Sequence, residues 1–276
     1  GQGAIRSHPY LLEEIRAVGD ADERRALDTF DGVLWRHVGH LLRTAMRTFA
    51  RSWTGGMFAP APDAGRARRF YRQMSRYSAA FAFTSDIAFL TLGGELKRRE
   101  LLSARLGDIL SELYLLAAAL KRWEDEGRRD TDWPLLAYCM ESGFATIEQR
   151  FDEIFANLPY LPVRWMLRFF VMPFGRRRRG PSDRLIRQVA GILTEPSETR
   201  ARLIGDIHMG SGDEPVAQLT RAFATVAEAQ PIHDRLRKAG IKDWRKGRGR
   251  GLIVAEGGGQ LEAAAHGIDL GQACWL

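Results

Sequence analysis

The segment 158–181 carries residue types that suit contact with an anionic lipid surface. Large apolar and aromatic side chains are interspersed with arginines there, and four consecutive arginines follow. An apolar, aromatic-rich helix flanked by basic residues is typical of an interfacial membrane anchor. Each arginine beside anionic lipid contributes about 1 kcal/mol of binding. The candidates for membrane contact are Trp165, Arg168, Phe169, Arg176, Arg177, Arg178 and Arg179. A packed helix with a solvated basic turn explains the same residues, and pairing with CoA phosphates is a third interpretation.

The glycine-rich opening is a candidate for contact with a cofactor phosphate. Gln2 and Gly3 stand in the run Gly-Gln-Gly-Ala-Ile-Arg. Backbone N–H groups of a glycine-rich turn that opens a helix can bind phosphate. A plain helix-entry turn gives the same pattern, because short glycine patterns are weak signals.

Other polar residues favour structural roles. Asp86 lies among apolar residues of a predicted helix, where a carboxylate needs a partner such as Arg105 or Lys97. His37 and His40 share a helical face without an acidic neighbour at helical spacing, so we predict no metal site. The sequence contains no nucleophilic serine elbow, P-loop or Cys-x-x-Cys pair, and we assign no catalytic residue to it.

Helical periodicity runs through most of the chain and must position these residues. Apolar spacing predicts helices over residues 33–53, 77–92 and 106–126, with Ser103 as N-cap and Gly127 as a stop for the third. In the first helix the spacing predicts burial of a wide set: Leu34, His37, Val38, Leu41, Leu42, Ala45, Met46 and Phe49.

The second half of the chain shows the same periodicity. Pro134 opens a helix that should reach about Asn157, and shorter helices are predicted near 182–193, 197–206 and 214–238. No strand alternation or internal repeat is visible. The fold class is therefore all-α: an antiparallel helical bundle followed by a smaller helical domain.

The net charge of +7 comes mainly from arginine. A basic surface attracts nucleic acid, anionic lipid or acidic ligands such as CoA, although arginine-rich composition can also follow from a GC-rich genome. Nucleic acid is disfavoured, because the basic residues are spread over amphipathic helices without a repeated stacking platform. The most apolar run, 77–92, is shorter than the roughly 20 residues that a bilayer requires. The chain begins without methionine, and we expect it to be part of a longer protein.

Four segments, in order, resemble the C-terminal region of the large bacterial acyl-CoA dehydrogenases of fatty-acid β-oxidation. The longest, residues 92–128, runs from Leu-Gly-Gly-Glu-Leu-Lys-Arg-Arg-Glu to Leu-Lys-Arg-Trp-Glu-Asp-Glu-Gly-Arg. The others are Gly-Gln-Gly-Ala-Ile-Arg-Ser-His-Pro-Tyr at 1–10, Asp-Trp-Pro-Leu-Leu at 132–136 and Pro-Ser-Asp-Arg-Leu at 181–185. The resemblance extends to about residue 234 and fades in the glycine-rich tail.

The resemblance implies an FAD-dependent oxidoreductase that converts medium- or long-chain acyl-CoA to trans-2-enoyl-CoA. In that family a Tyr-Glu-Gly-Thr loop commonly supplies the catalytic glutamate near the flavin, but Gly1 and Gln2 stand at that place here. The base is therefore expected upstream of Gly1, and Gln2 and Gly3 remain candidates for FAD contact. An unknown electron-transfer partner, a homo-oligomer and a cytoplasmic location, peripheral on the inner membrane, are further expectations.

The resemblance and the helical pattern together predict four regions. Residues 1–18 would end the flavin-proximal segment, 19–158 would form the bundle, and 159–246 would form an added helical domain with the basic loop. Residues 247–276 would be a poorly ordered, glycine-rich tail. We expect this part of the enzyme to stabilise or localise it; the alternative is a non-enzymatic helical adaptor that binds anionic membranes.

Overall fold

The computed structural model describes residues 10–19, 21–208, 210 and 212–238. These residues are helical and contain no strand, which confirms the all-α prediction. The chain divides into two compact units, Gly1–Val189 and Ala190–Leu276. The predicted tail, 247–276, and the candidate FAD contacts Gln2 and Gly3 lie outside the described residues.

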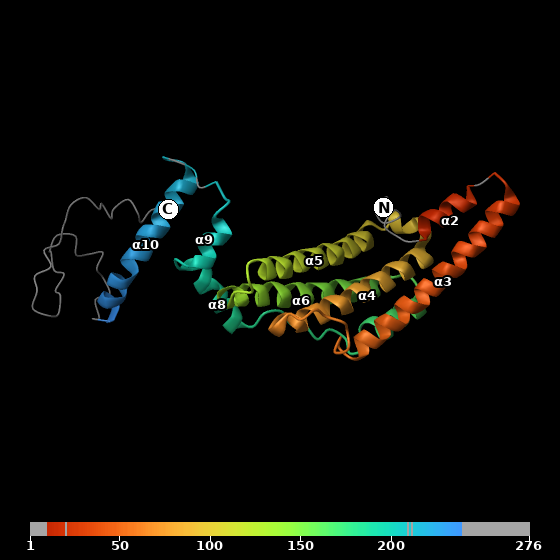
Figure 1. Cartoon of the computed structure of the whole chain (residues 1–276), viewed down its shortest axis with the longest axis horizontal. Coiled ribbons are helices and arrows are strands. Elements are labelled where there is room, and N and C mark those ends of the chain that lie inside the picture. Colours follow the sequence, from red (N-terminus) through yellow and green to blue (C-terminus); the bar gives the residue numbers. More distant parts are fainter. Residues whose placement is uncertain (1–9, 20, 209, 211, 239–276) are drawn as a thin grey trace, which may run out of the picture. The chain divides into compact units, whose positions relative to one another are not determined.

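The first unit is built on long helices that follow one another along the chain (Figure 1). They are α2 (Leu11–Val18), α3 (Glu23–Trp53), α4 (Arg68–Leu92), α5 (Glu100–Asp125), α6 (Trp133–Asn157) and α7 (Leu161–Val171). Short 3-10 turns, Gly65–Ala67, Gly93–Lys97 and Asp130–Asp132, precede α4, α5 and α6. Helices α4, α5 and α6 pack side by side, α3 packs against α4 and α7, and α2 lies on α3.

Local signals explain most helix ends. Gly93 has a φ of 50°, a conformation that favours glycine, and it ends α4. Gly127 follows the end of α5 at φ 86°, and α6 starts at Trp133 with proline in its first turn. The Ser103 N-cap prediction was wrong. α5 begins at Glu100, and the Ser103 hydroxyl donates to the carbonyl of Leu96 at 2.7 Å from within the helix.

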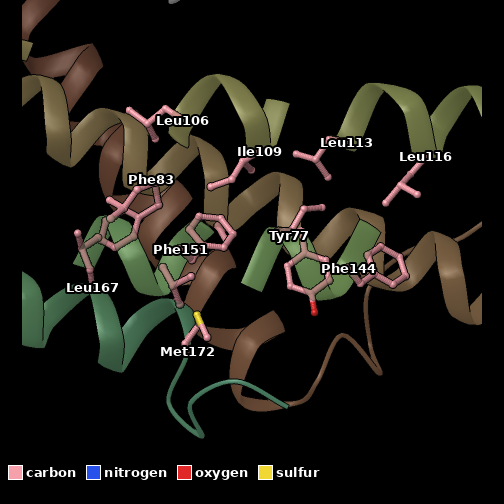
Figure 2. Close-up of a cluster of buried hydrophobic side chains, with 14 of the residues drawn as sticks. Tyr77, Phe83, Leu106, Ile109, Leu113, Leu116, Phe144, Phe151, Leu167 and Met172 are labelled. Carbon is pink, nitrogen blue, oxygen red and sulfur yellow. The ribbon is translucent and has the colours of Figure 1, made fainter. Parts of the chain in front are cut away.

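The core of the first unit forms where α4, α5, α6 and α7 face one another. Figure 2 shows Tyr77 and Phe83 from α4 with Ile109 from α5 and Phe151 from α6. Leu167 of α7 and Met172 after it are also buried in this core. Thus α7 packs on the bundle, and the first compact unit extends to Val189. The division proposed at residue 158 stays a prediction about domains.

Helix α3 buries a narrower stripe than its sequence predicts. Its buried residues are Val33, His37, Thr44, Thr48 and Ser52. Leu42 and Met46, which were predicted to be buried, are 61% and 65% exposed. Helices α2, α4 and α7 cover one side of α3. The apolar residues of α3 extend beyond that side, so a second apolar face is exposed to solvent.

The second unit contains the end of α8 (Asp183–Thr194), α9 (Glu198–Ile204) and α10 (Pro215–Lys238). Ser197 caps α9, because its hydroxyl accepts a hydrogen bond from the backbone N–H of Arg200 at 3.0 Å. The guanidinium of Arg200 lies over the Phe223 ring of α10 at 3.7 Å. These helices match the three short helices predicted from the sequence.

A partly exposed charged group connects α5 to α6. It predicts that the stability of the protein depends on pH. Glu153 accepts hydrogen bonds from Gln149, Arg150 and Arg105. These bonds, that from Gln149 first, lower the pKa of Glu153 from 4.5 to about 2. A carboxylate with a lowered folded-state pKa stabilises the protein fully above its unfolded-state pKa. That stabilisation is lost as the pH falls from 4.5 towards 2.

Replacing Glu153 with glutamine should therefore lower the free energy of unfolding by about 1 kcal/mol at neutral pH, a modest value because the site is partly exposed. The difference from wild type should shrink as the pH falls through that window. Urea unfolding across a pH series measures it, with Glu228→Gln on the exposed side of α10 as control. A difference that is constant with pH would contradict the role of the Glu153 charge.

Candidate functional site

A buried carboxylate lies beneath the basic loop, residues 172–182, which follows α7. Glu148 of α6 has no exposed surface. Its Oε1 accepts from the Tyr77 hydroxyl of α4 at 2.8 Å, and Arg76 Nη1 is 3.7 Å away. Its Oε2 accepts from the backbone N–H groups of Arg177 and Arg178, at 2.7 and 2.8 Å. One carboxylate thus connects α4, α6 and the loop.

Both carboxylate oxygens of Glu148 have hydrogen-bond donors, and a buried arginine balances the charge. Arg76 is only 6% exposed, and its guanidinium lies over the Tyr77 ring at 4.8 Å. Burial raises the pKa of Tyr77, so its hydroxyl remains a neutral donor to Glu148. A buried carboxylate needs an opposite charge and hydrogen bonds, and Glu148 has both. Both oxygens are engaged, so Glu148 holds the loop and is not free to accept a substrate proton.

Glu148 fixes the backbone of the loop while its arginine side chains face outward. Arg176, Arg177 and Arg179 are exposed, and Arg178 is half-buried. Arg177 lies over the Phe174 ring at 5.2 Å, and Arg178 over the Phe144 ring at 5.8 Å. Within residues 10–238, as far as they are described, none of the four makes an ion pair with an acidic side chain.

The other candidates for membrane contact fall into two groups. Trp165 is 67% exposed and Phe169 is 49% exposed, on the outer side of α7. Arg168 turns towards the bundle, where its Nη2 lies 2.8 Å from Asp152 Oδ1 of α6. Arg168 is thus held by an ion pair at the partly exposed edge between α7 and α6, whereas Trp165 and Phe169 face solvent.

Sequence reasoning missed the aromatic neighbours that α3 brings to this site. Trp53 contacts Phe169 and Phe174, with ring centroids 5.2 and 5.6 Å apart, and its indole N–H donates to the Phe169 carbonyl at 3.1 Å. Phe49 contacts Phe169 at 5.7 Å. These pairs join residues more than a hundred positions apart, which sequence spacing alone does not reveal. An acidic residue within the apolar stripe of α6 was the available signal for Glu148.

The remaining polar candidates have structural surroundings. His37 Nδ1 is 2.7 Å from Glu14 Oε1 of α2, and the Tyr10 ring stacks on it. Arg105, predicted as a partner for Asp86, contacts Glu153 instead. In the described part of the chain, no group of three His, Cys, Asp or Glu side chains is arranged to hold a metal ion. There, too, no helix is both long enough and apolar enough to span a bilayer.

Comparison with known proteins identifies the family to which this helical chain belongs. The family model described as "Acyl-CoA dehydrogenase, C-terminal, bacterial type" matches residues 5–255, almost the whole chain and both compact units. No solved structure matches the chain. The match includes the segments on which the resemblance rests, apart from the first four residues, and it agrees with the all-helical fold. The chain therefore belongs to the family of C-terminal domains of bacterial-type acyl-CoA dehydrogenases.

Proposed function

We propose that this chain is the C-terminal part of an FAD-dependent enzyme that oxidises medium- or long-chain acyl-CoA to trans-2-enoyl-CoA in fatty-acid β-oxidation. The family match over residues 5–255 carries the proposal. In this reaction the substrate loses a proton from its α-carbon and a hydride from its β-carbon. Bound FAD supplies the hydride acceptor. The proton requires a carboxylate or another base within reach of the α-carbon.

The catalytic base is proposed to lie upstream of this chain. The buried carboxylate of Glu148 does not suit the role, because Tyr77, Arg76 and two backbone N–H groups already use both of its oxygens. Glu153 is likewise held by Gln149, Arg150 and Arg105. Gln2 and Gly3, outside the described residues, remain the proposed contacts of the flavin nucleotide.

The role we propose for the described helices is structural and localising. The core of α4, α5, α6 and α7 forms a stable frame, and Glu148 holds the basic loop on that frame. The apolar outer side of α5 exposes Leu101, Leu110, Tyr114 and Leu115. A neutral apolar face of this kind suits contact with another protein surface, which is in keeping with a homo-oligomeric enzyme.

An anaerobic titration tests the proposed activity. The reading frame that contains this chain should yield a yellow protein with a flavin band at about 450 nm. That band should be lost when a long-chain acyl-CoA is added without oxygen. The matching trans-2-enoyl-CoA is the control, because it has no hydride left to donate. A comparison of short- and long-chain substrates then gives the chain-length preference.

The absence of flavin, or a band that survives excess acyl-CoA, would remove the dehydrogenase proposal. The non-enzymatic adaptor that binds anionic membranes would then be the better function. The observation that favours it is the group of loop arginines beside exposed Trp165 and Phe169, which have no acidic partner among the described residues.

A further inference from the structure

Two segments of the first unit contain no acidic residue. Residues 32–62 cover most of α3 and the loop after it, and residues 158–182 cover α7 and the basic loop. The chain has 34 acidic residues among 276, and residues 64–85 of the first unit also contain none. The first segment contains four arginines and the second contains six. Both segments are therefore purely cationic.

The fold brings these two segments together. Phe49 and Trp53 of α3 contact Phe169 of α7, and the Trp53 indole donates to the Phe169 carbonyl. Trp53 also contacts Phe174 of the basic loop. The solvent side of α3, the solvent side of α7 and the loop thus form one continuous surface, which we call the α3–α7 face.

The α3–α7 face exposes large apolar side chains. On α3 they follow helical spacing along one side, at Trp35, Leu42, Met46 and Trp53. On α7 Trp165 and Phe169 are four residues apart, and Phe58 in the loop after α3 is 81% exposed. Tryptophan and phenylalanine side chains that are exposed to this extent indicate a surface that contacts a membrane or another molecule.

Arginines border this apolar surface. Arg43 and Arg47 are exposed on α3, and Arg176, Arg177 and Arg179 are exposed on the loop. Other arginines of the two segments are engaged: Arg36 with Glu13, Arg168 with Asp152, and Arg51 with the Ser75 carbonyl. The border arginines make no ion pair among the residues that the structure describes. Within the described part of the chain, no acidic side chain neutralises their charge, so it can bind an external anion.

We propose that the α3–α7 face lies on an anionic lipid surface, with its aromatic and aliphatic side chains at the headgroup boundary and its arginines on lipid phosphates. The combination of an apolar face, exposed tryptophan and a purely cationic border is what such an interface requires. The outer side of α5 provides the contrast, since it is apolar and carries no comparable row of unpaired arginines. This inference does not depend on dehydrogenase activity.

The full chain can be tested by co-sedimentation with vesicles. It should sediment with phosphatidylcholine vesicles that contain phosphatidylglycerol, not with phosphatidylcholine alone, and added salt should weaken the binding. Arg176→Gln with Arg179→Gln should weaken partitioning about thirtyfold, because each arginine contributes about fivefold. Met46→Ser with Trp165→Ser should weaken it roughly tenfold or more, from lost apolar burial.

Matched variants control for charge and for apolar surface. Lys97→Gln with Arg98→Gln removes the same charge from exposed positions at the turn before α5. Val18→Ser with Leu90→Ser removes exposed apolar surface from α2 and α4, outside the α3–α7 face. Both controls should bind as wild type does, and circular dichroism should show the same helix content in every variant.

Several results would overturn the proposal. Failure to sediment with anionic vesicles would do so, as would equal losses in the test and control variants. A dimer that Met46→Ser with Trp165→Ser dissociates, together with no vesicle binding, would show that a second copy covers the face. Displacement by CoA or inorganic phosphate at constant ionic strength would indicate a site for soluble phosphate, and tighter binding to an oligonucleotide would indicate nucleic acid. Vesicle binding without flavin would leave this proposal intact and remove only the dehydrogenase.

Discussion

Replacement of Glu148 with glutamine is expected to lower the free energy of unfolding by about 3 kcal/mol or more. The carboxylate is fully buried and accepts from Tyr77, Arg177 and Arg178. Glutamine can keep an oxygen on the two backbone N–H groups and turn its amide N–H towards the Tyr77 hydroxyl, but its neutral oxygen accepts these bonds more weakly than a carboxylate does. It also leaves the buried guanidinium of Arg76 without its negative partner. Breaking a buried pair on one side is costly because an uncompensated charge remains inside the protein.

Urea unfolding measures the loss of stability, and amide exchange tests its location. The N–H groups of Arg177 and Arg178 should exchange faster in the variant, because the carboxylate no longer holds them. Tyr77→Phe is the milder companion. It removes the hydrogen bond to Glu148 and a longer one from Arg76, at 3.4 Å. It should cost about 1–2 kcal/mol, so it keeps the test informative if Glu148→Gln does not fold. Unchanged exchange at both amides would show that Glu148 does not hold the loop.

The spacing of apolar residues in α6 is enough to predict that Glu148 is buried. Phe144, Ile147 and Phe151 are fully buried on α6, and Glu148 lies among them at helical spacing. A charged residue within an apolar stripe must find partners inside the protein. The partners themselves could not be predicted, because Tyr77 and the amides of the basic loop are distant in sequence and meet only through packing.

Helix ends were predictable where glycine or proline marks them, and less so where capping is subtle. Gly93 and Gly127 marked the ends of α4 and α5, and Pro134 marked the start of α6, to within a few residues. The start of α4 was placed at residue 77, nine residues after its actual start at Arg68. The start of α3 was placed ten residues too late, at Val33 instead of Glu23. Residues 23–32 are nearly all exposed, so they show no apolar stripe. The Asp22 side chain caps the helix at their N-terminal end.

The membrane-contact candidates show what the spacing of residues in the sequence cannot predict. Trp165 and Phe169 are exposed as an interfacial helix requires, but Arg168 is already paired with Asp152 of α6 at the partly exposed edge of α7. The contribution of α3 was hidden, since apolar spacing treats Leu42 and Met46 as core residues. Periodicity can show that a helix has apolar positions, but the number of neighbours that cover them is a property of the tertiary fold.

Substitution of Gly143 with leucine is expected to lower the free energy of unfolding by about 3 kcal/mol. Gly143 lies in α6 where it faces α5. A Cβ added there would be 2.8 Å from Leu116 Cδ2 and 3.0 Å from Glu112 Oε2. Leu116 is itself buried, so a whole leucine side chain at 143 must separate the two helices. The close packing of α5 against α6 at Gly143 therefore depends on this missing side chain.

Gly107→Leu is the matched control, because Gly107 is also inside a helix but has nothing within 4 Å of an added Cβ. It should raise the free energy of unfolding by about 0.5–1 kcal/mol, as glycine is a poor helix former. Urea unfolding of both variants gives the comparison. If the two variants change the free energy of unfolding in opposite directions, packing outweighs helix propensity at Gly143. If both substitutions stabilise the protein, α5 and α6 can move apart at little cost. The two glycines look alike in sequence, so only the neighbouring helix can produce the difference between them.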